Sequence, residues 1–100
     1  MPDVYILKCA DGSYYVGLAQ VDLEGRVSEH NIGVDPRAYT FKRRPVVLVF
    51  NENYDRFDAA IARERQIKGW NRAKKEALIA YDYEGLPRLA KSRKKKQADS

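Results

Sequence analysis

Residues 4–18 read VYILKCADGSYYVGL and contain the pattern that decides the fold. Two runs rich in β-branched and aromatic residues, 4–9 and 13–18, lie on either side of Ala10-Asp11-Gly12, which is typical of a β-hairpin. The last residue of a three-residue hairpin loop adopts a left-handed conformation, and Gly12 stands at that position. The sequence therefore predicts two antiparallel strands joined by a three-residue loop.

The length of this loop decides which side chains share a face of the sheet. A three-residue loop pairs Cys9 with Ser13, and Tyr5 and Tyr15 become diagonal neighbours on one face. A two-residue Asp11-Gly12 turn would shift the register by one residue and put the two tyrosines on opposite faces. We predict the three-residue loop and a shared face.

Length and composition limit the class of protein. One hundred residues with 44% hydrophobic content can build one small core, which excludes a disordered chain and a two-domain enzyme. No apolar run approaches the roughly 18 residues that span a bilayer, and no secretory signal is recognisable, so we expect a cytoplasmic protein without a membrane partner. The single cysteine, Cys9, excludes a disulfide framework and a multi-cysteine zinc site. Without a Gly-rich phosphate loop, no nucleotide cofactor is expected.

Three helices and a further strand are predicted after the hairpin. The helices run from Asp22, as N-cap, to about residue 31, from Asp55, as N-cap, to about residue 68, and from Asn71, as N-cap, to about residue 81. Residues 33–45 have the composition of a loop. Residues 46–50, VVLVF, predict a strand buried on both faces.

Glu64 is the most informative single residue because it interrupts the apolar side of the second helix, between Ile61 and Ile67. A carboxylate facing a core must be desolvated, which is costly without a partner or a metal. Lys68, one turn further on, is one candidate partner. Arg26, beside the apolar side of the first helix, is another, or it is a clamp for phosphate.

The charge is concentrated in the second half of the chain. Residues 83–100 hold six Lys/Arg and two Asp/Glu, so they carry +4 of the formal net charge of +5. Residues 42–82 also carry +4, whereas residues 1–41 carry −3. A basic patch with a basic tail favours a polyanionic partner because phosphate contacts release counterions, although a solvated tail is the other interpretation.

Taken in order, these motifs resemble the GIY-YIG nuclease domain. The resemblance rests on VYI (4–6), YVG (15–17), DLEGR (22–26) and ERQIKGW (64–70), and it spans roughly residues 2–80. The shorter segments EHN, YT, RRP and RAKK, at residues 29–31, 39–40, 43–45 and 72–75, continue the match. The chain is most similar to the small stand-alone bacterial branch, which is related to the catalytic N-terminal domain of the nucleotide-excision-repair endonuclease.

The resemblance implies an α/β domain of the α+β type in residues 1–82, with a three-stranded antiparallel sheet flanked by about three helices, and a basic tail in residues 83–100. It places the two motif tyrosines at Tyr5 and Tyr15, the motif glycine at Gly17, the helical arginine at Arg26 and the metal-binding glutamate at Glu64. The implied activity is metal-dependent endonucleolytic hydrolysis of DNA, in repair or DNA processing, with one Mg²⁺ or Mn²⁺ per site. RNA is the alternative substrate.

Further residues are candidates for the rim of the site and for contacts with nucleic acid. The rim candidates are Lys8, His30 and Tyr39. The candidate nucleic-acid contacts are all basic residues of the second half: Lys42, Arg43, Arg44, Arg72, Lys74, Lys75, Lys94, Lys95 and Lys96.

One spacing departs from the family pattern. Eleven positions separate Arg26 from Tyr15, one more than is usual in the family. We interpret residues 19–21 as containing one inserted residue, which keeps Arg26 in register with its helix; otherwise Gly25 would take the catalytic place. The alternative function is therefore a nucleic-acid-binding module of the same fold with weak or absent catalysis.

Overall fold

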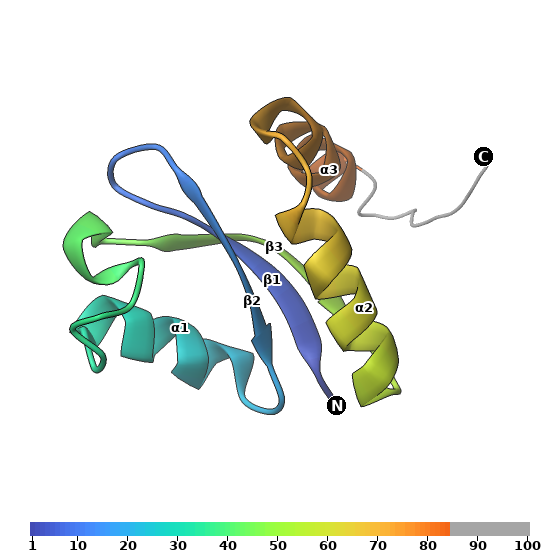
Figure 1. Ribbon diagram of the computed structural model, residues 1–100, viewed down its shortest axis with the longest axis horizontal. Helices are drawn as coiled ribbons and strands as arrows, with labels where there is room; N and C mark the ends of the chain where they lie inside the picture. The colour runs from blue at the N-terminus through green and yellow to red at the C-terminus, as the bar shows by residue number, and fades with distance from the viewer. Residues whose placement is uncertain (85–100) are drawn as a thin grey trace. The chain divides into compact units, whose positions relative to one another are not determined.

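A computed structural model describes residues 1–84 of the chain. Figure 1 shows the elements, which are, in order, β1 (Asp3–Lys8), β2 (Tyr14–Ala19), α1 (Leu23–Ile32), the short 3-10 helix η1 (Phe41–Arg43), β3 (Val47–Asn53), α2 (Phe57–Lys68) and α3 (Arg72–Glu84). The three strands form one antiparallel sheet, so the predicted α+β class is confirmed. Within residues 1–84, no helix has the length and apolar character needed to cross a membrane.

The hairpin has the predicted register. Tyr5 faces Gly17 and Leu7 faces Tyr15 across β1 and β2. Gly12 has a φ of 88°, the left-handed conformation expected at the end of the three-residue loop. Tyr5 and Tyr15 therefore share one face of the sheet, with their ring centroids 6.4 Å apart.

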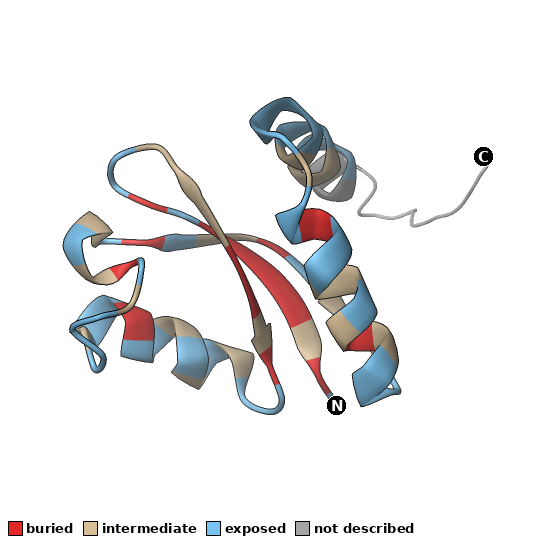
Figure 2. Cartoon of the chain, in the orientation of Figure 1, coloured by how far each residue is buried: buried red, intermediate tan, exposed pale blue. Residues whose placement is uncertain are grey.

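The buried central strand is β1, not β3. The strand order is β2-β1-β3, so β3 lies at an edge of the sheet, and its first residue, Val47, is 60% exposed. The prediction that residues 46–50 are buried on both faces is therefore wrong. In β1, by contrast, Val4, Tyr5, Ile6 and Leu7 are fully buried. Figure 2 shows much of this strand in the colour of buried residues.

The two faces of β1 are covered by different helices, which lie on either side of the strands in Figure 1. Tyr5 and Leu7 pack with Leu23 and Val27 of α1. Side chains alternate along a strand, so Val4 and Ile6 point to the opposite face, where α2 contacts β1 and β2. The residues of α1 and α2 thus approach the central strand from opposite sides.

The first helix begins as predicted, and the second does not. The Asp22 carboxylate accepts a hydrogen bond from the Gly25 backbone N–H at 3.0 Å, which caps α1. In α2 the N-cap is Arg56, without a side-chain hydrogen bond, so the predicted cap at Asp55 is wrong. The chain leaves the edge strand in an extended conformation and delays the helix to Phe57, whose side chain is 43% exposed.

Residues from Trp70 onward form a separate unit, in which the structure describes α3. The Asn71 side chain accepts a hydrogen bond from the Lys74 backbone N–H at 2.9 Å, which confirms the predicted cap. The helix continues through Glu84, beyond its expected end near residue 81. The basic tail, with Lys94, Lys95 and Lys96, falls almost entirely outside the described residues and stays a prediction.

Candidate active site

A chain of buried hydrogen bonds connects the central strand to α1 and to the loop that follows it. The Tyr5 hydroxyl lies 3.0 Å from His30 Nε2, and His30 Nδ1 lies 2.7 Å from Thr40 Oγ1. All three side chains are buried. A neutral imidazole has one donor and one acceptor nitrogen. The hydrogen bonds are therefore donated in the same sense along the series, either from Tyr5 to His30 and from His30 to Thr40, or in the reverse sense.

Burial keeps both titratable groups of this chain neutral near pH 7. Desolvation, together with the neighbouring Tyr15 and Glu64, raises the pKa of Tyr5 to about 12, although the guanidinium of Arg26 counteracts part of this shift. Desolvation and the positive charge of Arg26 lower the pKa of His30 below its ordinary value. Near pH 7, Tyr5 is therefore a phenol and His30 is a neutral imidazole.

The lowered pKa of His30 predicts that stability depends on pH. The unfolded chain binds a proton at His30 below about pH 6.5 while the folded chain resists it, so the free energy of unfolding falls as the pH falls from about 6.5 toward 5. The slope is at most about 1.4 kcal/mol per pH unit, because one proton is involved. His30 is the single histidine, so urea unfolding of His30→Gln should show a flatter profile in this range. Equal slopes in parent and variant would contradict a buried neutral imidazole.

Arg26 reaches Tyr5 from α1. Its guanidinium is close enough to lower the pKa of Tyr5, and its Nη1 donates to Glu29 Oε1 at 3.0 Å. Asp22, with a φ of 54°, precedes this helix and caps it. The inserted residue that would keep Arg26 in register stays a prediction.

Glu64 lies on the side of α2 that faces the sheet. Its side chain is 17% exposed, and its Oε2 lies 3.0 Å from Lys68 Nζ. The negative charge of the carboxylate is the smallest of the influences on the pKa of Tyr5, and it raises that pKa. Of the two partners considered from the sequence, Lys68 is the one that pairs with Glu64, whereas Arg26 pairs with Glu29.

Gly17 leaves the space that Tyr5 occupies. A Cβ at this position would lie 2.5 Å from both Cζ and Oη of Tyr5, and 2.9 Å from Cε2 of Tyr15. No side chain larger than hydrogen fits there without moving a tyrosine. The two tyrosine rings therefore leave no room for a side chain at Gly17.

Two of the three rim candidates lie at the site. His30 is in the buried chain, and the Tyr39 ring stacks near Tyr15, with centroids 6.1 Å apart. Lys8, at the end of β1, belongs to the face opposite Tyr5 by strand alternation, and it is exposed. The structure does not bring Lys8 to the tyrosines.

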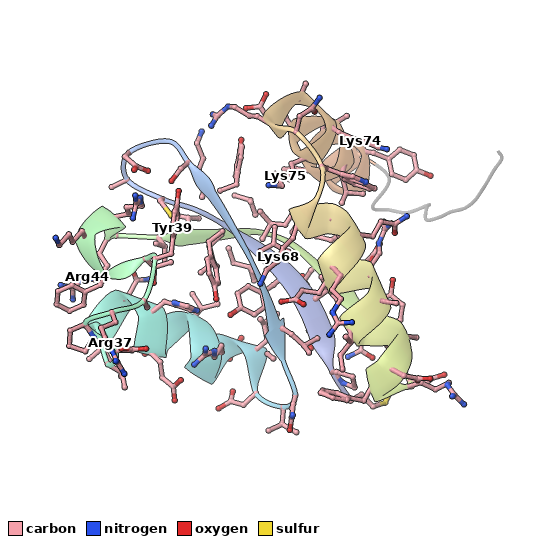
Figure 3. All side chains as sticks on the ribbon, viewed as in Figure 1. Arg37, Tyr39, Arg44, Lys68, Lys74 and Lys75 are labelled. Carbon is pink, nitrogen blue, oxygen red and sulfur yellow. The ribbon has the colours of Figure 1, made fainter. Side chains whose placement is uncertain are left out.

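Two of the predicted nucleic-acid contacts near α1 have structural partners. Arg43 pairs with Asp11 at 3.1 Å, and its guanidinium lies 3.8 Å over the Tyr39 ring. Arg44 donates to the carbonyl oxygen of Ile32 at 3.0 Å and so satisfies the C-terminal end of α1, where Figure 3 labels it. Both arginines therefore have partners within the fold.

The other described candidates for nucleic-acid contacts are on η1 and α3. Lys42, in η1, is exposed. Arg72 pairs with Glu76 on α3 at 3.0 Å, and Figure 3 shows Lys74 and Lys75 on the same helix. The nucleic-acid contacts stay predictions.

Sequence reasoning assigned no role to Thr40 or Glu29. Thr40 lies in a segment without periodicity, and its contact with His30 exists because that segment folds back on α1. The ion pair between Glu29 and Arg26 could have been predicted from the sequence, because Glu29 follows Arg26 by three residues on one helix and opposite charges at this spacing pair.

The carboxylate of Glu64 fits a hard divalent cation. In the described part of the chain, no three His, Cys, Asp or Glu side chains gather into a cluster. Mg²⁺ does not require such a cluster, because it is commonly held by one or two carboxylates and keeps several waters. Lys68, the partner of Glu64, is 52% exposed and can turn into solvent when a cation takes its place.

The fold and these residues define a GIY-YIG catalytic domain. Residues 1–77 match this family, described as "GIY-YIG catalytic domain", and the chain belongs to it. Such a domain indicates a nuclease-type function on nucleic acid, and nucleases of the family generally use divalent metals.

Within the family, the chain is similar to UPF0213 proteins. One from Halobacterium salinarum is 46% identical over 79 residues, which cover 79% of this chain and 100% of the relative. One from Staphylococcus aureus is 49% identical over 76 residues, which cover 76% of this chain and 90% of the relative. The solution NMR structure of the UPF0213 protein BH0048 from Bacillus halodurans has 33% identity and a TM-score of 0.54, with 92% of this chain and 100% of that chain covered.

Proposed function

We propose that the chain is a divalent-metal-dependent endonuclease that hydrolyses phosphodiester bonds in DNA, selects substrates by structure rather than sequence, and acts in repair or DNA processing. The observation that carries the proposal is the buried hydrogen-bond chain at Tyr5, whose hydroxyl lies 3.0 Å from His30 Nε2. The charges of Arg26 and Glu64 act on the pKa of this tyrosine in opposite directions. A buried phenol hydrogen-bonded to a histidine is a costly arrangement for stability, which is common at functional sites.

Arg26 binds and stabilises the phosphate in this proposal. Its guanidinium presents a planar fork of donors that matches two phosphate oxygens. Negative charge grows on these oxygens in the transition state, so a fixed donor there lowers the barrier. The pair with Glu29 is half-exposed on both sides, so exchanging the carboxylate for a phosphate costs little.

Tyr5 and His30 move the proton of the attacking water. With a pKa of about 12, Tyr5 does not act as a standing phenolate at neutral pH. Instead, the Tyr5 oxygen takes a proton from the water while its own proton passes to Nε2 of His30, 3.0 Å away. Thr40 fixes the imidazole by accepting from Nδ1–H. Tyr15 packs against the Tyr5 ring and holds its orientation.

Glu64 would hold one Mg²⁺ or Mn²⁺. When bound, such an ion supplies charge stabilisation for the phosphate and the leaving 3′-oxygen. Glu64 reaches this position because it lies on the side of α2 that faces the sheet, four residues before Lys68 on the same helix.

The test is a nicking assay on plasmid DNA and on labelled duplex, single-stranded, flap and bubble oligonucleotides, with Mg²⁺, Mn²⁺ or EDTA. We expect metal-dependent cleavage, and a loss of about 100-fold or more in Tyr5→Phe, which keeps the ring and removes the proton carrier. Cleavage that persists in EDTA, or that is equal in Tyr5→Phe, would contradict the proposal.

A second candidate is a nucleic-acid-binding module without chemistry. The observation that favours it is that Arg26 and Glu64 already have partners, Glu29 and Lys68, each at 3.0 Å. The same assay separates the two candidates, because a binding module retains DNA in a mobility shift and leaves every substrate intact with either metal.

The basic tail should supply much of the salt dependence of binding. Residues 85–100 hold six Lys/Arg and one Asp. Each phosphate that is no longer neutralised lowers the slope of log affinity against log salt by roughly 0.7–0.9, so truncation after Glu84 should reduce the slope by up to about five. Lys42→Ala, the matched single-charge control, should reduce it by about one at most. An unchanged slope after truncation would assign the affinity to residues 1–84.

A further inference from the structure

A pocket of about 230 Å³ opens beside the tyrosines and extends away from them. It shares Tyr15, Arg26, His30 and Thr40 with the candidate active site. The remaining lining residues come from α1 and from residues 33–41, and they include Glu29, Ala38, Tyr39 and Phe41. None of these four side chains takes part in the proposed proton transfer or metal binding, so the proposed hydrolysis does not explain this part of the pocket.

The size and walls of the pocket suit a single aromatic heterocycle. Its volume lies below the roughly 300–1,000 Å³ of pockets for larger small molecules. Tyr39 is 43% exposed, and its ring is stacked near Tyr15, with centroids 6.1 Å apart and an interplanar angle of 21°. The guanidinium of Arg43, 3.8 Å over the Tyr39 ring, holds that ring in place. Aromatic rings of this kind stack nucleobases with little dependence on their identity.

Glu29, which lines the pocket, offers a hydrogen-bond acceptor once Arg26 binds a phosphate. Glu29 accepts a hydrogen bond from Arg26 at 3.0 Å. When Arg26 turns to a phosphate, the Glu29 carboxylate loses this donor and is open to another. The exocyclic amine of a nucleobase is a donor of the right kind. Binding of a phosphate by Arg26 and of a base by Glu29 would therefore support each other.

We propose that this pocket binds one unpaired nucleotide of the DNA strand, next to the phosphate that is cleaved. The inference rests on the proposed function. A base inside a duplex is stacked and paired, and removing it costs a few kcal/mol, least where it is already unpaired. The pocket thus selects flaps, bulges, gaps and single-stranded ends over intact duplex.

The experiment fills the pocket without altering the proposed catalytic residues. Ala38 is half-buried and lines the pocket, so Ala38→Phe occupies its volume. Ala62→Phe makes the same change at an exposed position of α2 and is the matched control. Val34→Trp, at a pocket residue that is 65% exposed, is a second filling variant in case the first folds poorly.

Cleavage is compared on a duplex with one unpaired adenine, the same duplex fully paired, and the same duplex with an abasic site in place of the adenine. We expect the parent and Ala62→Phe to cleave the unpaired substrate about tenfold faster than the other two. In Ala38→Phe this preference should fall toward one, with cleavage of paired duplex unchanged. A preference that survives in both filling variants would overturn the inference.

A second readout does not depend on cleavage. With EDTA present, an oligonucleotide whose unpaired base is 2-aminopurine should lose fluorescence on binding the parent, because its base stacks on tyrosine, and should lose much less on binding Ala38→Phe. Quenching in the parent without cleavage of any substrate would refute the endonuclease and leave the pocket assignment standing. Cleavage without any difference in quenching between parent and Ala38→Phe would refute the pocket assignment alone.

Discussion

We expect Glu64→Gln to abolish metal-dependent cleavage, with a loss of at least about 100-fold, and to leave the free energy of unfolding equal to or above that of the parent. Gln keeps the volume and the hydrogen-bonding capacity of the side chain and removes the charge that would hold the cation. A divalent ion contributes several kcal/mol to the stabilisation of charge in such reactions, which corresponds to rate losses of this size.

The fold should tolerate this change because no buried charge loses its partner. Arg26 keeps its pair with Glu29, so it is not left uncompensated. Lys68 loses Glu64, but it is 52% exposed and can be hydrated. Pairs of this kind contribute about 0.5 kcal/mol or less, whereas breaking a buried pair costs about 3–5 kcal/mol. Moreover, a half-buried carboxylate near Tyr5 is itself a cost that Gln reduces.

Thermal melts of the metal-free proteins, beside the cleavage assay, distinguish the two roles of Glu64. Glu76→Gln is the matched control, because it removes the same charge from an i,i+4 pair, with Arg72 on α3. Glu76→Gln should cleave like the parent. A large destabilisation of Glu64→Gln with cleavage intact would assign Glu64 to the fold and remove it from the reaction.

The hairpin and its consequences could be predicted because they depend on local geometry. Loop length sets the register, and strand alternation then places Tyr5 and Tyr15 on one face. The position of β3 could not be predicted in the same way, because an apolar run such as residues 46–50 occurs in central and edge strands alike. Which strand is central depends on pairing between distant segments, here β1 with β3.

The contacts of the candidate site that depend on spacing along a helix could be predicted from the sequence. The contacts that depend on the path of a loop could not. The spacing of Glu64 and Lys68 allowed their pair, and the helical position of Arg26 allowed its approach to the tyrosines. The contact between His30 and Thr40 depends on how residues 33–45 return to α1. The Asn31 side chain fixes the end of this loop against α1 through two hydrogen bonds with the backbone of Val46, at 2.7 and 3.0 Å. Nothing in the spacing of those residues indicates such a contact.

Gly17→Ala should damage both stability and catalysis, because the added methyl group has no space. The Tyr5 side chain is fully buried and its hydroxyl is hydrogen-bonded to His30, so rotating the ring away from the added methyl group would cost free energy. Cβ would lie 2.5 Å from Tyr5 Cζ, far inside ordinary van der Waals contact. Overpacking of this kind costs about 1–3 kcal/mol. A displacement of Tyr5 by about 1 Å can reduce the rate of cleavage by roughly 100-fold.

Gly69→Ala is the matched control for this substitution. Its Cβ would meet its nearest neighbour, the Gln66 carbonyl oxygen, at 3.5 Å, and the backbone at Gly69 is right-handed with a φ of −79°. This variant should unfold and cleave like the parent. Urea unfolding gives the free energy of unfolding of each variant. Cleavage is compared at a temperature where both variants are fully folded. A lower rate in Gly17→Ala then reports displaced tyrosines rather than unfolded protein. If Gly17→Ala cleaves at the parent's rate, the Tyr5 hydroxyl does not have to occupy its present position for the reaction, and its assignment as the proton carrier fails.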